Sequence, residues 1–136
     1  MHHFPTKDVL IMCLIENLAD EFCDTVEKFA TLDPQAHGRN LRAYALAVGS
    51  QSTTQCSQWR AVDSAHSANA AHRSVWRRRF HHLMLTEEQL TTDIVNVKLI
   101  RLAIDGLWYV NLYSHHELTS EMRSQVVERI VGMTRL

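Results

Sequence analysis

Residues 86–114, TEEQLTTDIVNVKLIRLAIDGLWYVNLYS, carry a sharp helical signal and contain no proline. Thr86 and Gln89 have the spacing of a capping box, in which each side chain bonds a free backbone N–H at the start of a helix. We therefore predict a helix from Glu87 to about Ser114, roughly 40 Å long. Such a helix is long for a globular protein, and its apolar side chains decide what must pack around it.

The apolar residues of this predicted helix form two stripes rather than one. The first stripe consists of Leu90, Ile94, Val97, Ile104 and Trp108, and the second of Val95, Leu99, Leu102, Leu107 and Val110. Two apolar faces need two packing partners. A last helix, predicted over 119–134, also spreads its apolar residues too widely for one contact. A second copy of the chain covers both surfaces economically, so we predict a homodimer with a four-helix interface that includes Val97, Arg101, Ile104, Val126, Ile130 and Met133.

The rest of the chain also follows helical spacing. Between residues 7 and 30, apolar residues recur at steps of three and four, and Thr6 can cap the first turn. A second helix is predicted over Arg39–Ala47, and the polar stretch Gly49–Gln55 is predicted to be a loop. Residues 59–82 are predicted to form two shorter helices or one bent helix. With four glycines and two prolines, the chain has few turn residues for a β fold, so we predict an all-α protein of about six helices.

The composition limits the partners that the protein can have. The chain has 136 residues, of which 46% are hydrophobic, and this is enough for one compact domain with a core. Its net charge of -1 provides no field that would draw it to DNA or to an acidic membrane. The longest apolar run, Val9–Ile15, is far shorter than the roughly 20 residues that span a bilayer. Because the three cysteines also lack CxxC spacing, we expect a soluble cytoplasmic protein that is not bound to membranes.

Large aromatic residues on the predicted inward faces could enclose a cavity for a small hydrophobic or aromatic ligand. We predict such a site between the first helix and residues 59–82, with polar groups from His66 or Asp105. The candidate ligand-binding residues are Phe22, Tyr44, Trp59, His66, Trp76, Asp105 and Trp108. The alternative is that the aromatic residues simply fill the core. In either case Asp105 should be hydrogen-bonded, because an unpaired carboxylate inside an apolar helix is costly.

The sequence lacks the common patterns of catalytic and metal-binding sites. It contains no nucleophile elbow, glycine-rich phosphate loop or pair of catalytic carboxylates, so we expect no enzyme activity and no cofactor. The histidine pairs at 2–3, 81–82 and 115–116 lack the spacing of metal ligands, so we expect no metal. A group of arginines would spread around a helix, which favours a solvated helix end over a nucleic-acid patch; its members are Arg73, Arg77, Arg78 and Arg79.

Segments at both ends of the chain resemble a known family. The opening MHHFPTKDVL resembles the junction between the recognition helix and the fourth helix of TetR-type transcriptional repressors, with matches at His3, Phe4, Pro5, Thr6, Lys7, Asp8 and Leu10. Residues 37–47, HGRNLRAYALA, resemble the start of the fifth helix in one subgroup. Residues 101–133, RLAIDGLWYVNLYSHHELTSEMRSQVVERIVGM, are similar to the last two helices of that subgroup. The match is good at both ends and poor in the middle.

The resemblance implies an effector-binding and dimerisation domain over residues 8–136, with residues 1–7 as a remnant of a helix-turn-helix domain. Most of that DNA-binding domain would be missing before Met1, so Lys7 would touch a DNA phosphate only in a full-length protein, and we expect no sequence-specific DNA binding. The resemblance also implies that a small-molecule effector binds among the first five helices and that the last two helices pair in a homodimer. The rival hypothesis is a helical dimerisation or interaction module without a ligand. An internal cavity would favour the first hypothesis.

Overall fold

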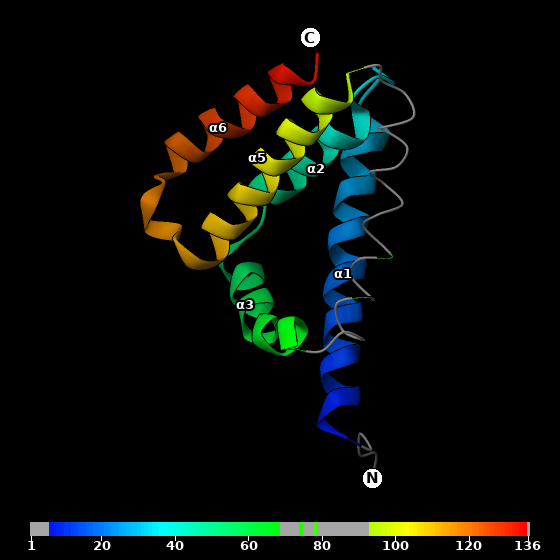
Figure 1. The fold of residues 1–136 in the computed structure, drawn as a ribbon, viewed down its shortest axis with the longest axis vertical. Coiled ribbons are helices and arrows are strands. Elements are labelled where there is room, and N and C mark those ends of the chain that lie inside the picture. The colour runs from blue at the N-terminus through cyan, green and yellow to red at the C-terminus, as the bar shows by residue number, and fades with distance from the viewer. Residues whose placement is uncertain (1–5, 69–73, 75–77, 79–92, 136) are drawn as a thin grey trace.

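The computed structural model describes residues 6–68, 74, 78 and 93–135. In this part of the chain every regular element is helical: α1 (Lys7–Leu32), α2 (Arg39–Gly49), α3 (Thr53–Ala68), α5 (Ile94–Tyr113), the short 3₁₀ helix η1 (His115–Glu117) and α6 (Ser120–Met133) (Figure 1). The prediction of an all-α fold is therefore confirmed. None of the described helices is long and apolar enough to cross a membrane.

The first helix, α1, begins and ends close to the predicted positions. Thr6 caps it, because its hydroxyl oxygen accepts a hydrogen bond from the backbone N–H of Val9 at 3.1 Å. Its buried residues recur at helical spacing and form one face: Ile15, Leu18, Ala19, Phe22 and Val26. The helix ends before Asp33, which has an extended backbone and is followed by Pro34.

The second helix, α2, lies at the centre of the described fold, because it packs against α1, α5 and α6. Most of its surface is therefore buried, and three of its buried residues are alanines that let neighbouring helices approach closely: Ala43, Ala45 and Ala47. Gly38 precedes the helix with a φ of 73°, a left-handed conformation that favours glycine. A Cβ atom at Gly38 would also lie 2.8 Å from Nη1 of Arg42 and 2.9 Å from the backbone oxygen of Thr134.

The third helix, α3, corrects the predicted loop over Gly49–Gln55. The helix already begins at Thr53, because Ser52 and Gln55 form a reciprocal capping box. The N–H of Gln55 donates to the Ser52 hydroxyl at 3.1 Å, and the N–H of Ser52 donates to Oε1 of Gln55 at 2.9 Å. The polar residues that indicated a loop are thus partly the start of a helix.

The helix predicted from Glu87 begins later, at Ile94, as α5. Oδ1 of Asp93 accepts a hydrogen bond from the N–H of Asn96 at 3.0 Å and caps the first turn. The prediction of one continuous helix from Glu87 is therefore wrong, and the Thr86–Gln89 capping box lies outside the described residues. One face of α5 is buried, and its apolar members are Val97, Ile100, Ile104, Leu107 and Leu112.

The last helix, α6, has the predicted bounds. Thr119 caps it by accepting a hydrogen bond from the N–H of Met122 at 3.1 Å, and Thr134 follows its last residue. The expected excess of apolar surface on this helix is not observed. Val127 and Ile130 are buried and Val126, Val131 and Met133 pack against the core, because α2 and α5 both contact α6.

Candidate ligand-binding site

Four of the predicted ligand-binding residues lie together in one aromatic cluster at the centre of the fold. They come from four helices: Phe22 from α1, Tyr44 from α2, Trp59 from α3 and Trp108 from α5. The ring of Phe22 meets the rings of Tyr44 and Trp108 edge to face, with centroids 6.1 and 5.1 Å apart, and Trp59 meets Trp108 at 5.3 Å. These are the favoured geometries of aromatic pairs, so the rings pack against one another.

Asp105 is hydrogen-bonded, as the sequence predicted. The hydroxyl of Tyr44 donates to Oδ1 of Asp105 at 2.6 Å. Burial raises the pKa of Tyr44 well above 10.0, and the negative charge of Asp105 adds to this effect. The Tyr44 phenol therefore stays protonated at neutral pH and keeps its role as the donor.

The aromatic cluster leaves little room for a ligand. Of the candidate residues whose side chains are described, Phe22 and Trp59 border a cavity of about 170 Å³ between α1, α2 and α3. This volume is below the roughly 300–1,000 Å³ of typical ligand sites. The side chain of His66 and the whole of Trp76 lie outside the described residues. The geometry of the described part favours the alternative in which these aromatic residues fill the core, and ligand binding by the set stays a prediction.

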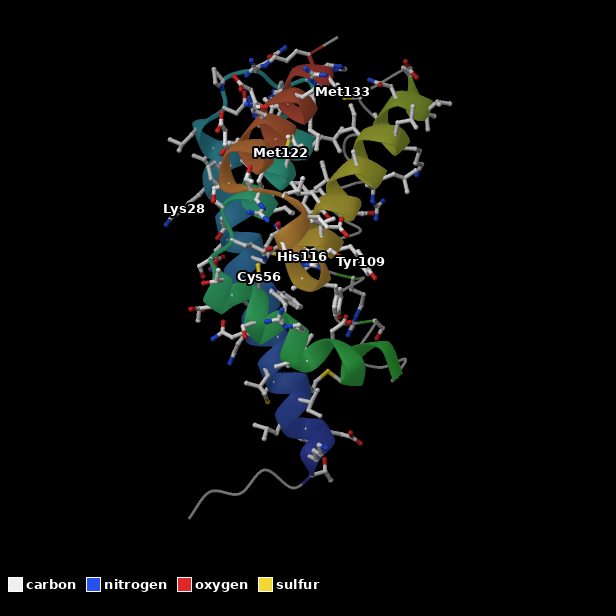
Figure 2. The ribbon with its side chains drawn as sticks, turned by 90° about the vertical axis from the view of Figure 1, so that its left-hand side faces the viewer. Lys28, Cys56, Tyr109, His116, Met122 and Met133 are labelled. Atoms are coloured by element: carbon white, nitrogen blue, oxygen red, sulfur yellow. The ribbon has the colours of Figure 1, made fainter. Side chains whose placement is uncertain are left out.

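A larger cavity of about 730 Å³ lies elsewhere, between the end of α2, the start of α3 and α6. We call it the α6 cavity; its principal lining residues are Phe29, Leu46, Cys56, Arg123, Val127 and Val131. Figure 2 shows Cys56 on α3 and Met122 on α6, the helices on two sides of this cavity. None of the five predicted ligand-binding residues whose side chains are described lines the α6 cavity.

A short chain of hydrogen bonds holds a cation in the wall of the α6 cavity. The Asn111 amide donates to the backbone oxygen of Val48 at 3.1 Å, and its own oxygen accepts from Nε of Arg123 at 2.8 Å. Asn111 is buried, so this polar link is shielded from water. Burial raises the pKa of the Cys56 thiol, although Arg123 and Arg60 oppose the shift. At neutral pH the cavity wall thus contains a neutral thiol beside a fixed arginine.

Sequence reasoning missed these residues, although a signal was present. Asn111 and Arg123 are polar residues near the ends of two apolar helices, and Asn111 had no assigned role. Gln51 belongs to the polar stretch between α2 and α3 and lines both cavities. Its Oε1 atom is buried and accepts no hydrogen bond within the described residues. Polar residues near the ends of helices, or in the connections between them, were the sequence feature that could have indicated the lining of this cavity.

The predicted dimer-interface residues are mostly covered within the single chain. Val97, Ile104 and Ile130 belong to the core, and Arg101, Val126 and Met133 are half-buried. Most of the exposed apolar residues of α5 lie on another face and, together with Gly106, are separated alternately by four and three residues; Ile94, which is 50% exposed, is not one of them. We call them the α5 stripe: Val95, Leu99, Leu102, Tyr109 and Tyr113, with Gly106 in the middle. Val95 and Leu102 are 71% and 65% exposed.

Most residues of the histidine pairs and of the arginine group lie outside the residues that the structure describes. The histidine pairs 2–3 and 81–82 lie outside the described residues, as do Arg73, Arg77 and Arg79. Arg78 is exposed, and its Nε donates to the backbone oxygen of Ser74 at 3.3 Å. In the part of the chain that the structure describes, no three His, Cys, Asp or Glu side chains converge as metal ligands would.

Comparison with protein families gives one match that spans most of these helices. Residues 38–135 match the family described as Tetracyclin repressor-like, C-terminal domain. The chain belongs to this family. Comparison with the curated proteins and with the solved structures finds no match.

Membership in the TetR-like C-terminal domain family confirms the resemblance that the sequence indicated and makes the chain a TetR-family transcriptional regulator. The match begins at Gly38, so it contains α2, α3, α5 and α6, while α1 precedes it. Lys7 is the exposed first residue of α1, and its contact with a DNA phosphate stays a prediction.

Proposed function

We propose that this TetR-like chain is the regulatory core of a homodimeric transcriptional regulator, which assembles through α5 and responds to a small-molecule effector. The proposal rests on the α5 stripe, an apolar seam whose members are 42–71% exposed in the described chain, with the Tyr113 hydroxyl at its end donating to Asp63 of α3. The role is regulatory rather than enzymatic. We place the protein in the cytoplasm, where the thiols of Cys13, Cys23 and Cys56 would stay reduced.

The spacing of the α5 stripe supports pairing with another helix. Steps of four and three residues keep side chains on one side of a helix, as in the seams of helix pairs and bundles. In Figure 2, Tyr109 of the stripe and Lys28 of α1 lie on opposite sides of the molecule. An exposed apolar strip of this kind marks a contact surface in water-soluble regulators. A twofold dimer would place the stripes of two copies against each other.

The α6 helix contributes less to this proposed interface than the sequence predicted. Its exposed large apolar residue is Met122, while Val127 and Ile130 already fill the core of one chain. A charge at Ile130 would therefore damage the fold as well as any interface. The informative substitutions lie on α5 instead.

The rival hypothesis of an interaction module without a ligand is less favoured, because the chain contains a cavity of about 730 Å³. This volume lies within the range of small-molecule sites, roughly 300–1,000 Å³. A module that only paired helices would need no such space. The cavity is separate from the α5 stripe, so the two parts of the proposal can be tested separately.

Replacing Leu102 with Glu tests the dimer. We expect sedimentation equilibrium to give about twice 15.7 kDa for the wild-type chain at micromolar concentration and a monomer for Leu102→Glu. A buried unpaired carboxylate in the seam is strongly unfavourable. Leu32→Glu is the matched control, because Leu32 is 79% exposed at the end of α1 and outside the stripe. A monomeric wild-type chain, or a dimer that tolerates Leu102→Glu, would contradict the proposal.

A further inference from the structure

We infer that the α6 cavity binds a small monocarboxylate with an apolar body, and that Arg123 pairs with the carboxylate. This inference rests on the proposed effector-binding function and names the site and the chemical class of the ligand. It differs from the site that the sequence predicted, which was built on the aromatic cluster.

The walls of the α6 cavity suit an apolar molecular body. Phe29 of α1, Leu46 of α2, and Val127 and Val131 of α6 provide apolar surface from three helices. Leu46, Phe29 and Val131 are only half-buried in the described structure, so a ligand could remove more of their surface from water. Burial of such surface favours binding in proportion to its area.

Arg123 gives the cavity a cation whose position is already set. Its Nε atom donates to the oxygen of buried Asn111 at 2.8 Å, and Asn111 is anchored on the backbone of Val48. The side chain is half-buried, so its charge is screened less by solvent than that of an exposed arginine. A guanidinium held in this way is well suited to a planar carboxylate, with which it forms charge-assisted hydrogen bonds.

The other groups around the cavity favour a ligand that carries a single negative charge. Thr53, Ser120 and Ser124 line it and can donate hydroxyl hydrogen bonds to an anion. Glu128 also lines the cavity but is exposed, five residues beyond Arg123, and would repel a second negative charge. Burial raises the pKa of the Cys56 thiol, which therefore adds no negative charge at neutral pH. A monocarboxylate fits this set of charges better than a dianion or a cation.

The test uses octanoate and 1-octanol as a matched pair of probes, because both carry the same apolar chain and only octanoate carries a charge. Isothermal titration calorimetry on the full chain should show octanoate binding about tenfold more tightly than octanol, the effect of one charge-assisted hydrogen bond. Arg123→Met should weaken octanoate about tenfold and leave octanol unchanged. Arg129→Met is the matched control, since Arg129 is an exposed arginine of α6 that does not line the cavity.

A second variant tests the same site in case Arg123→Met fails to fold. Ser124 is exposed and lines the cavity, so Ser124→Trp should fill it and abolish binding of both probes. Gln125→Trp, next to it on α6 and outside the lining, should bind both probes like the wild type. Equal affinities of the wild type for octanoate and octanol, no binding of either probe, or unchanged binding by Ser124→Trp would overturn the inference.

Sedimentation of the same samples separates this inference from the proposed dimer. A dimer that fails to bind octanoate overturns the carboxylate site and leaves the proposal for the α5 stripe intact. A monomer that binds octanoate with the expected dependence on Arg123 supports the site and contradicts the dimer.

Discussion

The guanidinium of Arg42 is fully buried and bonds four groups, three in the connection between α1 and α2 and one, Thr134, 92 residues further along the chain. Nε donates to Oδ2 of Asp33 at 2.5 Å, and the terminal nitrogens donate to the backbone oxygens of Gln35 at 2.7 Å and His37 at 2.8 Å and to the hydroxyl of Thr134 at 3.1 Å. One side chain therefore ties the connection between α1 and α2 to the end of α6. A buried charge is tolerated here because it is paired and hydrogen-bonded.

Arg42→Met should lower the free energy of unfolding by about 3 kcal/mol at pH 7, because it removes the donor to Oδ2 of Asp33 and to the backbone oxygens of Gln35 and His37. The hydrogen bond from Arg42 lowers the pKa of Asp33, although burial opposes the shift. Because the folded pKa lies below the unfolded value of 3.8, this stabilisation is complete above that pH and is lost as the pH falls through the folded pKa.

The difference between the wild type and Arg42→Met should therefore shrink as the pH falls through the folded pKa of Asp33. Urea unfolding at pH 7 and in acid, at one protein concentration, measures this difference. The exposed Arg129→Met variant should change stability by less than about 0.5 kcal/mol at both pH values. A difference for Arg42→Met that is independent of pH would show that the ion pair with Asp33 does not stabilise the fold.

At the scale of elements, the contact between α2 and α6 closes the back of the α6 cavity. Gly49 is the last residue of α2, and a Cβ atom there would lie 2.7 Å from Cγ2 of Val127 on α6. Glycine thus allows the two helices to approach each other more closely than any other residue would. Gly132, near the end of α6, has nothing within 4 Å of a Cβ position in the described chain.

Gly49→Ala should destabilise the chain by about 1–2 kcal/mol, since the overlap with Val127 outweighs the better helix propensity of alanine. Gly132→Ala makes the same chemical change in open space and should stabilise the chain by up to about 1 kcal/mol. Thermal unfolding of the two variants beside the wild type measures both effects. Equal shifts of the two melting temperatures would mean that the α2–α6 contact has room for a Cβ atom at Gly49.

At the scale of the whole molecule, the proposed interface and the proposed ligand site lie on different parts of the fold. In Figure 1, α1 and α6 lie at opposite sides, with α2 and α5 between them. The α6 cavity is bordered by α2, α3 and α6, whereas the α5 stripe belongs to α5 alone. Gly106 lies in the middle of the stripe, and no atom of the described chain comes within 4 Å of a Cβ there. No close helix approach is therefore made at Gly106 within the described chain, and the proposed dimer would place a partner helix there.

Gly106→Ala should affect folding and assembly in opposite directions. The alanine should stabilise α5 by up to about 1 kcal/mol through helix propensity. In the dimer, its methyl group should hold the two α5 helices apart and raise the dissociation constant about tenfold, a change of about 1.4 kcal/mol. Sedimentation over a range of concentrations measures the dissociation constant. An unchanged constant with a stabilised chain would show that the interface does not pass over Gly106.

The sequence by itself determined the features that depend on neighbouring residues. Thr6 caps α1 as predicted, because a cap is made by a hydroxyl and a backbone N–H three residues away, and Thr119 caps α6 by the same local contact. The spacing of apolar residues identified α1, α2 and α6 and the all-α class. The predicted hydrogen bond of Asp105 is present, but its carboxylate is exposed, so the cost of burial is not its cause, and the sequence could not name buried Tyr44 as the donor.

Only the tertiary structure decided which apolar face of each helix is covered. The structure follows neither predicted stripe of α5 completely, because it buries Leu107 of the second stripe and leaves Ile94 of the first stripe 50% exposed. The structure buries Val97 and Ile104 and leaves Leu102 exposed. The structure likewise fills the space around the aromatic cluster and leaves the α6 cavity open. Both outcomes depend on how several helices pack together. Such contacts join residues far apart in the chain, and local spacing carries no information about their distance.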